Sequence, residues 1–395
     1  MRWALTPLAD HCELITKGTT PTTLGFSFSD SGIPFLRVQN IDGGRVNFLG
    51  DTLYIEASTH QALRRSQIQQ GDVLVSIAGT IGRAGVVPDA APPLNCNQAV
   101  AIVRPHSTID RHFLRHWLEG PEAKSQMRGS VVTGTIANLS LSQLGSLQLS
   151  LPPLAEQKRI AAILDNADAL RAKRRAAFAQ LDALTQSIFL DMFGDPIKNS
   201  KRFPVRPMIE LIDPARPISY GILMPGPDQV DGVKYVRVTD MRDGGIELSG
   251  IRKTTEAISN TYRRSLLKAG DLLMSIRGHV GRFAVVPAEL DGANITQDSA
   301  RLAIVDADPV FVRECLRAPG FQHWMAKHTK GVAVQGINLG DVKLMPIIMP
   351  TIDMQRAFAR AANAAAAVRR AHRESLAKLD DLFASLQHRA FRGEL

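Results

Sequence analysis

Apolar residues in the stretch from Leu154 to Phe193 recur at alternating steps of three and four positions. Pro152 and Pro153 precede the stretch and the next proline is Pro196, so nothing interrupts a helix of about 40 residues, roughly 60 Å long. A stripe this narrow is typical of a coiled coil and needs a partner helix to cover it. The predicted seam, with Arg174 as its interior polar position, contains Ile160, Ile163, Ala167, Leu170, Ala177, Leu181, Leu184 and Ile188.

A second stretch near the C-terminus repeats this pattern. Pro350 and Gln355 stand where Pro152 and Gln157 stand in the first stretch. The second predicted seam, with His372 at the position of Arg174, contains Phe358, Ala361, Ala365, Val368, Ser375, Leu379, Leu382 and Leu386. We expect the two long helices to pair with each other, and two separate core helices in ordinary domains are the alternative.

The segments before the two helices also repeat, at an offset of about 200 residues. The repeated blocks are 32–38 with 232–238, 71–88 with 270–287, 95–98 with 294–297, and 136–139 with 336–339. Short β-type runs bounded by Gly and Asp, with one helix over 110–119, indicate an α+β unit in each copy. The predicted organisation is 1–151 first domain, 152–195 first long helix, 196–349 second domain and 350–395 second long helix.

Charge and cysteine usage narrow the class of partner. Lys and Arg number 47 against 38 Asp and Glu, a net charge of +9, which favours a polyanion, nucleic acid before a membrane. Cys12, Cys96 and Cys315 are odd in number and lack metal-ligand spacing, so we expect reduced thiols in the cytoplasm and no metal site. No apolar run has membrane-spanning length.

Catalytic signatures are absent from the sequence. The turn Gly79–Gly85 lacks the spacing of a dinucleotide loop, and Val86–Pro88 deny it a following helix, so we interpret it and its copy as tight turns between strands. No Asn/Asp-Pro-Pro-aromatic tetrapeptide of base-amino methyltransferases occurs, because Leu151–Leu154 has neither the polar nor the aromatic end. We therefore expect a binding protein rather than an enzyme.

Polar and basic side chains at equivalent places in both copies are the candidate DNA contacts. Positions identical in the two copies suit framework or phosphate roles: Arg37 and Arg237, Arg83 and Arg282, Gln98 and Gln297. Positions that differ within preserved surroundings suit base readout: Ala78/Arg277, Thr80/His279, Asn97/Thr296, Ala99/Asp298, Thr133/Ala333 and Thr135/Gln335. Lys17, Thr19, Thr20 and Tyr220 are further loop candidates. Neutral drift in loops is the alternative for each differing pair.

These motifs carry a family resemblance. The block Gly71–Arg83 with its copy, and the helix entry Leu151–Leu164, together resemble the specificity subunit of Type I restriction-modification enzymes over essentially the whole chain. The second helix entry keeps only Pro350, Gln355 and a basic residue of that pattern.

The resemblance implies two target recognition domains, each reading one half of a split double-stranded DNA sequence. It implies that the two helices form an antiparallel coiled coil, which sets the spacer and docks two methyltransferase subunits. S-adenosylmethionine would be bound by those subunits, and restriction subunits would add ATP-driven translocation and cleavage. The chain itself would be non-catalytic. A stand-alone DNA-binding regulator and a self-contained DNA methyltransferase are the alternatives.

Overall fold

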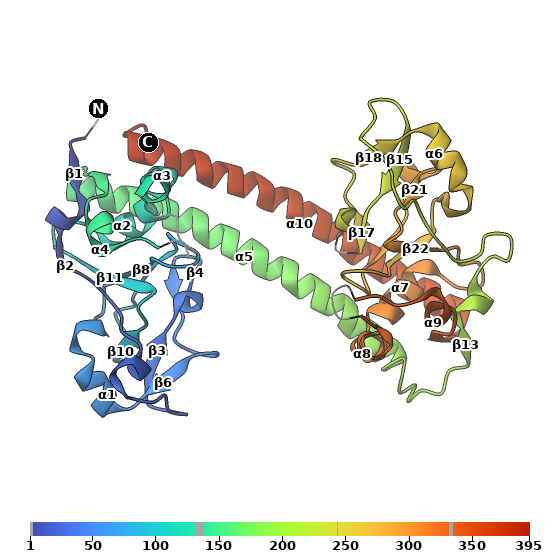
Figure 1. Cartoon of the computed structure of the whole chain (residues 1–395), viewed down its shortest axis with the longest axis horizontal. Coiled ribbons are helices and arrows are strands. Elements are labelled where there is room, and N and C mark those ends of the chain that lie inside the picture. Colours follow the sequence, from blue (N-terminus) through green and yellow to red (C-terminus); the bar gives the residue numbers. More distant parts are fainter. Residues whose placement is uncertain (1–2, 131–137, 243, 332–334) are drawn as a thin grey trace. The chain divides into compact units, whose positions relative to one another are not determined.

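The computed structural model of the chain describes residues 3–130, 138–242, 244–331 and 335–395. Its contacts divide the chain into two compact units. The first unit contains Met1–Ala177 with His372–Leu395, and the second unit is Phe178–Ala371. Each unit therefore holds one half of each long helix: α5 (Leu154–Phe193) and α10 (Ile352–Arg392), green and red in Figure 1. The domain boundaries predicted from the sequence stay a prediction.

The first unit is built on two packed sheets. One has six strands in the order β2 (Cys12–Lys17), β11 (Val100–Pro105), β8 (Val73–Ser76), β9 (Ala84–Val86), β5 (Arg45–Val46) and β4 (Ile41–Asp42). The other has the order β6 (Leu53–Ile55), β3 (Ile33–Leu36), β10 (Leu94–Cys96) and β7 (Gln67–Ile68), while β1 (Leu5–Pro7) pairs with β12 (Gln148–Ser150). Neighbouring strands are antiparallel except in the pairs β3–β10 and β5–β9.

Strands β8 and β11 are buried on both faces because the first unit has three layers. Val73 and Val75 join a core with the helices, whereas Leu74, between them, joins a second core between the sheets. The first unit contains the helices α1 (Ala57–Ala62), α2 (Arg111–Leu118), α3 (Pro121–Ser130) and α4 (Leu141–Gly145), together with one half each of α5 and α10. This explains why β8 has a continuous apolar run, without the alternation of apolar and polar residues that a strand with one exposed face shows.

The second unit repeats this plan with shorter strands. Its sheets have the orders β14 (Ser219–Tyr220), β22 (Ser299–Leu302), β19 (Leu272–Ser275), β20 (Phe283–Val285), and β18 (Arg252–Thr254), β15 (Val233–Val236), β21 (Asn294–Ile295). Two further pairs are β16 (Met241–Arg242) with β17 (Gly245–Ile246) and β13 (Val205–Pro207) with β23 (Pro346–Ile348). The helices are α6 (Glu256–Thr261), α7 (Pro309–Arg317), α8 (Pro319–His328) and α9 (Leu339–Lys343). The parallel pair β15–β21 corresponds to β3–β10.

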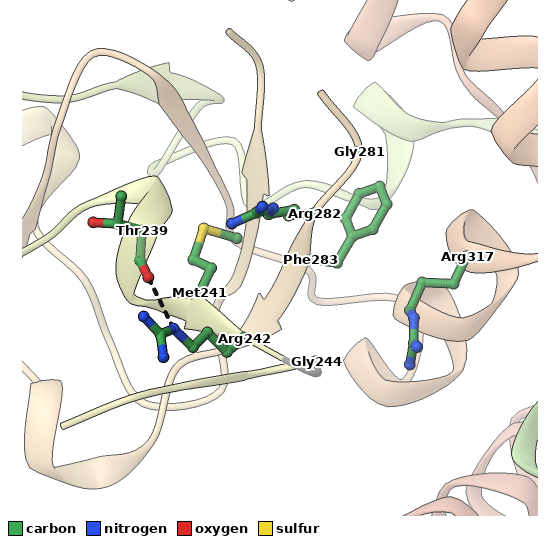
Figure 2. A pocket seen from close by; sticks show the side chains of 8 residues that line it. All are labelled: Thr239, Met241, Arg242, Gly244, Gly281, Arg282, Phe283 and Arg317. Carbon is green, nitrogen blue, oxygen red and sulfur yellow. Dashed lines mark hydrogen bonds between the residues drawn. The ribbon is translucent and has the colours of Figure 1, made fainter. Parts of the chain in front are cut away.

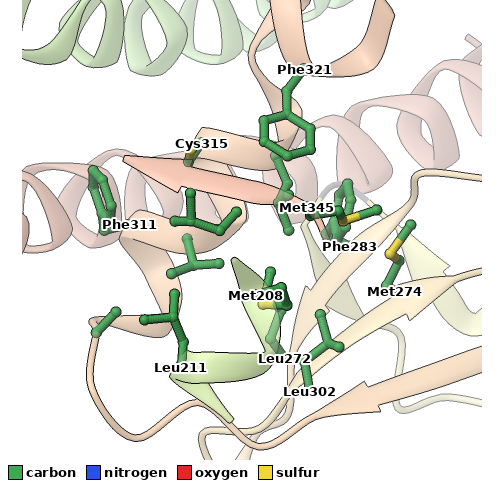
Figure 3. Close-up of a cluster of buried hydrophobic side chains, with 14 of the residues drawn as sticks. Met208, Leu211, Leu272, Met274, Phe283, Leu302, Phe311, Cys315, Phe321 and Met345 are labelled. Carbon is green, nitrogen blue, oxygen red and sulfur yellow. The ribbon is translucent and has the colours of Figure 1, made fainter. Parts of the chain in front are cut away.

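The main core of the second unit packs its sheet against α7 and the long helices. Leu272 and Met274 from β19 belong to the same apolar cluster as Phe311 from α7, and Figure 3 shows part of this cluster. Phe189 of α5 lies 5.4 Å from Phe358 of α10, measured between ring centroids. The sheet core and the helix pair are therefore one continuous apolar cluster in this unit.

The two long helices run antiparallel within each unit. In the first unit, Arg159 of α5 donates to the carbonyl of Leu395, and Arg171 contacts Asp380 at 2.6 Å. In the second unit, the guanidinium of Arg369 lies 5.1 Å above the ring of Phe178. Earlier residues of one helix thus meet later residues of the other in both units. The predicted fold class, α+β with two repeated domains and an antiparallel pair of long helices, is confirmed.

The predicted seam is correct at most positions and wrong at five. The heptad set that includes Ile160, Ala167, Phe358 and Leu386 lies inside or partly inside the helix pair, as expected. Five positions of the other predicted set lie outside it: Leu170, Leu184, Val368 and Leu382 are 54%, 49%, 46% and 51% exposed, and Ala361 is exposed as well. The remaining three, Ile163, Ala177 and Ser375, are partly buried. The places of the five exposed residues in the seam are taken by residues one position later.

The residues that replace them include polar side chains, which explains the error. Arg171 lies 4.2 Å from the ring centroid of Phe383 and bonds Asp380, while Arg369 is 8% exposed against Phe178. Each cation is stabilised by an aromatic face and its stem covers apolar surface. A seam assigned from apolar residues alone therefore selects Leu170 and Val368 instead of the arginines that follow them.

A buried glutamine joins each unit to the start of a long helix. Gln157 accepts a hydrogen bond from the Asp110 amide at 2.8 Å and donates to the Pro152 carbonyl at 2.9 Å. Gln355 makes the same two contacts, with the Asp308 amide at 2.9 Å and the Pro350 carbonyl at 2.9 Å. Both glutamines are 1% exposed. The repeated proline–glutamine spacing in the sequence is thus a structural link.

We expect Gln157→Leu to lower the free energy of unfolding by about 1–3 kcal/mol, because the amide of Asp110 and the carbonyl of Pro152 lose their buried partner. The matched control is Gln180→Leu, at an exposed position of the same helix, which should change stability by less than about 0.5 kcal/mol. Urea denaturation measures both. Equal stability of the two variants would contradict the proposed link.

Candidate nucleic-acid interface

One serine in each unit organises the turn that follows the central strand. Ser76 accepts a hydrogen bond from the Arg83 amide at 2.8 Å and donates to the Thr80 carbonyl at 2.5 Å. Ser275 makes the same contacts with the Arg282 amide and the His279 carbonyl. The turn between β8 and β9, and its copy between β19 and β20, are therefore tight turns between strands, as predicted. These serines are not among the candidates that the sequence predicts, although their identity in both copies is a usable signal.

Positive backbone angles make glycine necessary in these turns. Gly79 and Gly82 have φ of 72° and 84°, and Gly278 and Gly281 have φ of 70° and 86°. Side-chain-bearing residues rarely adopt this left-handed conformation. The glycines thus fix the backbone.

Other side chains on these turns point away from the backbone contacts. Thr80 in the first unit and Arg277 and His279 in the second are exposed. This is the arrangement expected of a constant framework with variable reading positions.

A second loop in each unit packs closely against the end of a strand: the loop at Gly18 against β10, and the loop at Gly221 against β21. A Cβ atom on Gly18 would lie 2.1 Å from the Cys96 carbonyl oxygen, and one on Gly221 would lie 1.8 Å from that of Ile295. Only glycine permits this approach. It brings the candidates Lys17, Thr19 and Thr20 beside Asn97 and Gln98 in the first unit, and Tyr220 beside Thr296 and Gln297 in the second.

These loops and the turn form one surface in each unit. In the second unit, the Gly221 amide bonds the Thr296 carbonyl, the Ile276 amide bonds the Asp298 carbonyl at 2.8 Å, and the Gly278 amide bonds the Gln335 carbonyl at 2.9 Å. In the first unit, the Ile77 amide bonds the Ala99 carbonyl at 2.9 Å, and Ala78 bridges to Asn138. Candidates distant in sequence are therefore brought together by backbone contacts.

Several candidates that are identical in both units have contacts within the chain. Arg237 bonds the buried carboxylate of Asp240 at 2.6 Å, and this hydrogen bond raises the pKa of the Arg237 guanidinium. Arg37 lies 3.7 Å from Asp51. Such contacts support a framework role, which was one of the two roles predicted for identical positions.

The two glutamines hold the neighbouring loop. Thr20 donates to the side chain of Gln98. With its amide turned, Gln297 donates to the carbonyls of Ile222 at 2.7 Å and Leu223 at 3.3 Å. In both units the same glutamine thus positions the loop that carries further candidates.

One described candidate does not extend the surface. Thr296 is 8% exposed, so its side chain is covered, whereas its counterpart Asn97 is partly exposed. The side chain of Thr296 could contact a base only if the residues that cover it moved. Thr133 and Thr135 lie outside the described residues.

The described residues contain no candidate metal site and no candidate reactive cysteine. Within residues 3–130, 138–242, 244–331 and 335–395, no group of three His, Cys, Asp or Glu side chains could hold a metal ion. Burial raises the pKa of the Cys12 and Cys315 thiols to about 12, so they are protonated at neutral pH. Among the described helices, none has both the length and the apolar content to cross a membrane.

Residues 2–177 match the Type I restriction modification DNA specificity domain family. The specificity subunit of the Type I restriction enzyme EcoBI from Escherichia coli is 27% identical over 420 residues, which cover 98% of this chain and 85% of that protein. The EcoKI specificity subunit from Escherichia coli strain K12 is 22% identical over 421 residues, covering 100% of this chain and 89% of that protein.

Two solved structures share the fold. A chain from a study of complex assembly and conformational transition in the Type I restriction-modification system has a TM-score of 0.54 at 18% identity, covering 100% of this chain and 98% of its own length. The Type I specificity subunit from M. genitalium has a TM-score of 0.56 at 14% identity, covering 98% and 96%. The resemblance seen in the sequence is thereby confirmed: residues 2–177 match the specificity domain family, and nearly the whole chain is similar to specificity subunits of Type I restriction enzymes.

Proposed function

We propose that this chain is the DNA-recognition subunit of a Type I restriction-modification enzyme, in which each unit reads one part of a bipartite target. One observation carries the proposal. The same backbone surface is built twice, from Ser76 and Gly18 in one unit and from Ser275 and Gly221 in the other, but it presents different side chains. A constant support with variable exposed groups suits recognition of two different base sequences.

The exposed side chains have the chemistry of base readout. Arg277 and Gln335 can each bond two acceptor or donor atoms of a base edge in the major groove, and Thr80 can donate or accept one bond. The identical arginines Arg83 and Arg282 suit phosphate contacts, which position the protein without reading sequence. The two units would therefore share a way of binding the duplex and differ in the bases they select.

Replacing Arg277 with Ala should alter only the half-site that the second unit reads. The loss of one bidentate base contact costs about 1–3 kcal/mol of discrimination against the wrong base. Sequencing of sites methylated in a host carrying the variant measures the change. A variant that leaves both half-sites intact, or that alters the half-site of the first unit, would contradict the assignment.

The non-catalytic role also belongs to the proposal. Methyl transfer, with S-adenosylmethionine, would be carried out by two methyltransferase subunits, and cleavage by restriction subunits in systems that contain them. The similarity to specificity subunits supports this division of labour. A self-contained methyltransferase would instead methylate DNA as an isolated chain with labelled cofactor. A stand-alone regulator would bind its site with full affinity without a methyltransferase subunit.

An exposed apolar face on the long helices supports the docking of partners. Leu170 and Leu382 are exposed in the first unit, and Leu184 and Val368 in the second. These are the positions that adjoin the seam on both helices, and in an antiparallel pair they lie on one side. Exposed apolar stripes mark interaction sites. The same stripe in each unit suits two copies of one partner.

The double change Leu170→Gln and Leu382→Gln should weaken association with a methyltransferase subunit without lowering the stability of the chain, because neither side chain is in the seam. The control is Leu49→Gln, which changes a leucine that is 72% exposed on a loop of the same unit. Co-purification and thermal unfolding measure the two properties. Unchanged association, or loss of stability equal to that of a core change, would argue against this docking face.

We also propose that the length of the helix pair sets the unread spacer of the target. Each unit is fixed to one helix start by Gln157 or Gln355, and α5 continues without a break for 40 residues. A rigid connection of about 1.5 Å per residue would define the distance between two reading surfaces.

Insertion of one heptad into both helices should therefore lengthen the spacer and leave both half-sites unchanged. A heptad preserves the seam, so the paired helices are retained. Insertion of three residues in both helices is the control, since it rotates the seam and should abolish function. Sequencing of methylated sites reports the spacer, and an unaltered spacer in an active heptad variant would refute the idea.

A further inference from the structure

A cleft of about 580 Å³ in the second unit is lined by three arginines. Arg242 comes from β16, Arg282 from the end of the turn before β20, and Arg317 from the last turn of α7. Figure 2 shows Arg242 and Arg282 on one side of this cleft and Arg317 on the facing helix. Three separate elements thus bring guanidinium groups to one place. The sequence had identified only Arg282 among them.

Of the carboxylates that the structure describes near the cleft, Glu314 pairs with Arg317, and none pairs with Arg242 or Arg282. Glu314 is fully buried and is shared by two arginines, with Arg313 at 2.7 Å and Arg317 at 3.1 Å from the same oxygen. The guanidinium groups of Arg242 and Arg282 are exposed and form no ion pair among the described residues, which do not include Asp243. The cleft therefore presents two guanidinium groups, those of Arg242 and Arg282, that no described carboxylate pairs with.

The first unit has the opposite chemistry at the same positions. Asp42 corresponds to Arg242 and Glu119 corresponds to Arg317, while Arg83 corresponds to Arg282. Glu119 lies 3.1 Å from Arg115. The guanidinium of Arg115 packs so closely on Gly44 that a Cβ atom there would lie 1.6 Å from it. The space is filled and the charge is paired there. The cleft with three arginines is thus a property of the second unit alone among the described residues.

We propose that this cleft binds a phosphate group of the DNA backbone, beside the surface on which the second unit reads bases. The proposal rests on the DNA-recognition function and adds to it. Guanidinium groups match phosphate oxygens with paired, charge-assisted hydrogen bonds, and the exposed groups of Arg242 and Arg282 favour an anion over an apolar ligand.

The location fits this ligand. Arg282 belongs to the same turn as Arg277 and His279, so a duplex contacting those side chains carries its backbone next to the cleft. The second unit would then supply more of the salt-dependent, sequence-independent affinity than the first unit.

The first test compares the full-length chain with its Arg242→Gln variant, each together with a methyltransferase subunit, on a duplex of random sequence over a range of salt concentrations. Loss of one phosphate contact should reduce the slope of log K against log salt by about 0.9. The matched control is Arg360→Gln, which removes the same charge from an exposed position of α10 in the same unit and should leave the slope unchanged. Thermal unfolding of both variants should equal that of the unmodified chain.

The second test uses inorganic phosphate as the probe and does not depend on DNA. Phosphorus NMR of phosphate should show broadening by the unmodified chain, and at least a tenfold weaker effect with Arg242→Gln combined with Arg282→Gln. Equal broadening by both proteins would overturn the anion site. Broadening that is lost in the variant, together with an unchanged salt slope on DNA, would overturn the DNA backbone as occupant in favour of a small phosphate compound.

Failure of the broader function would be distinguishable from failure of this site. A duplex bound equally well, and with the same salt slope, by the chain and by Arg242→Gln would refute the phosphate contact and leave DNA recognition intact. If the unmodified chain bound no duplex even with a methyltransferase subunit present, DNA recognition itself would be refuted, and the DNA backbone as occupant with it.

Discussion

Pairing of α5 with α10 is the interaction on which the other features of this protein depend. A helix of 40 residues with a narrow apolar stripe cannot bury that stripe by itself, and the only matching stripe in the described chain belongs to the other long helix. Phe189, Phe193 and Phe358 show the strength of this constraint, since each is fully buried and such a side chain contributes about 1.5–3 kcal/mol. Each unit contains one half of both helices, so neither unit is complete without residues from a distant part of the sequence.

The repeat separates support from recognition in a way that a single domain would not reveal. Identical residues such as Gln157 and Gln355, or Ser76 and Ser275, make the same hydrogen bonds in both units. Substitution there would leave buried polar groups without partners, so these positions have little freedom. Exposed positions on the same turns carry no such cost. Specificity can therefore change without loss of the fold.

The two units differ in charge as well as in their reading side chains. Asp42 and Glu119 in the first unit stand where Arg242 and Arg317 stand in the second. The difference follows from how a buried arginine is neutralised. In the first unit, Arg115 pairs with Glu119 at the end of α2. In the second unit, the corresponding Arg313 pairs with Glu314 within α7, so the position that corresponds to Glu119 can be an arginine, Arg317. Similar folds thus present different electrostatic surfaces to a polyanion.

The sequence by itself determined the two copies, the two long helices and their pairing, because repeats and heptad periods are local patterns that survive without coordinates. It also determined which turns needed glycine. It misplaced five positions of the seam: Leu170 and Val368 are more apolar than Arg171 and Arg369, yet they lie outside it. Only the tertiary structure decided this, because Arg171 becomes acceptable in a seam through Asp380 and the face of Phe383, and both partners lie about 200 residues away. The same holds for the arginine cleft, which three distant elements assemble.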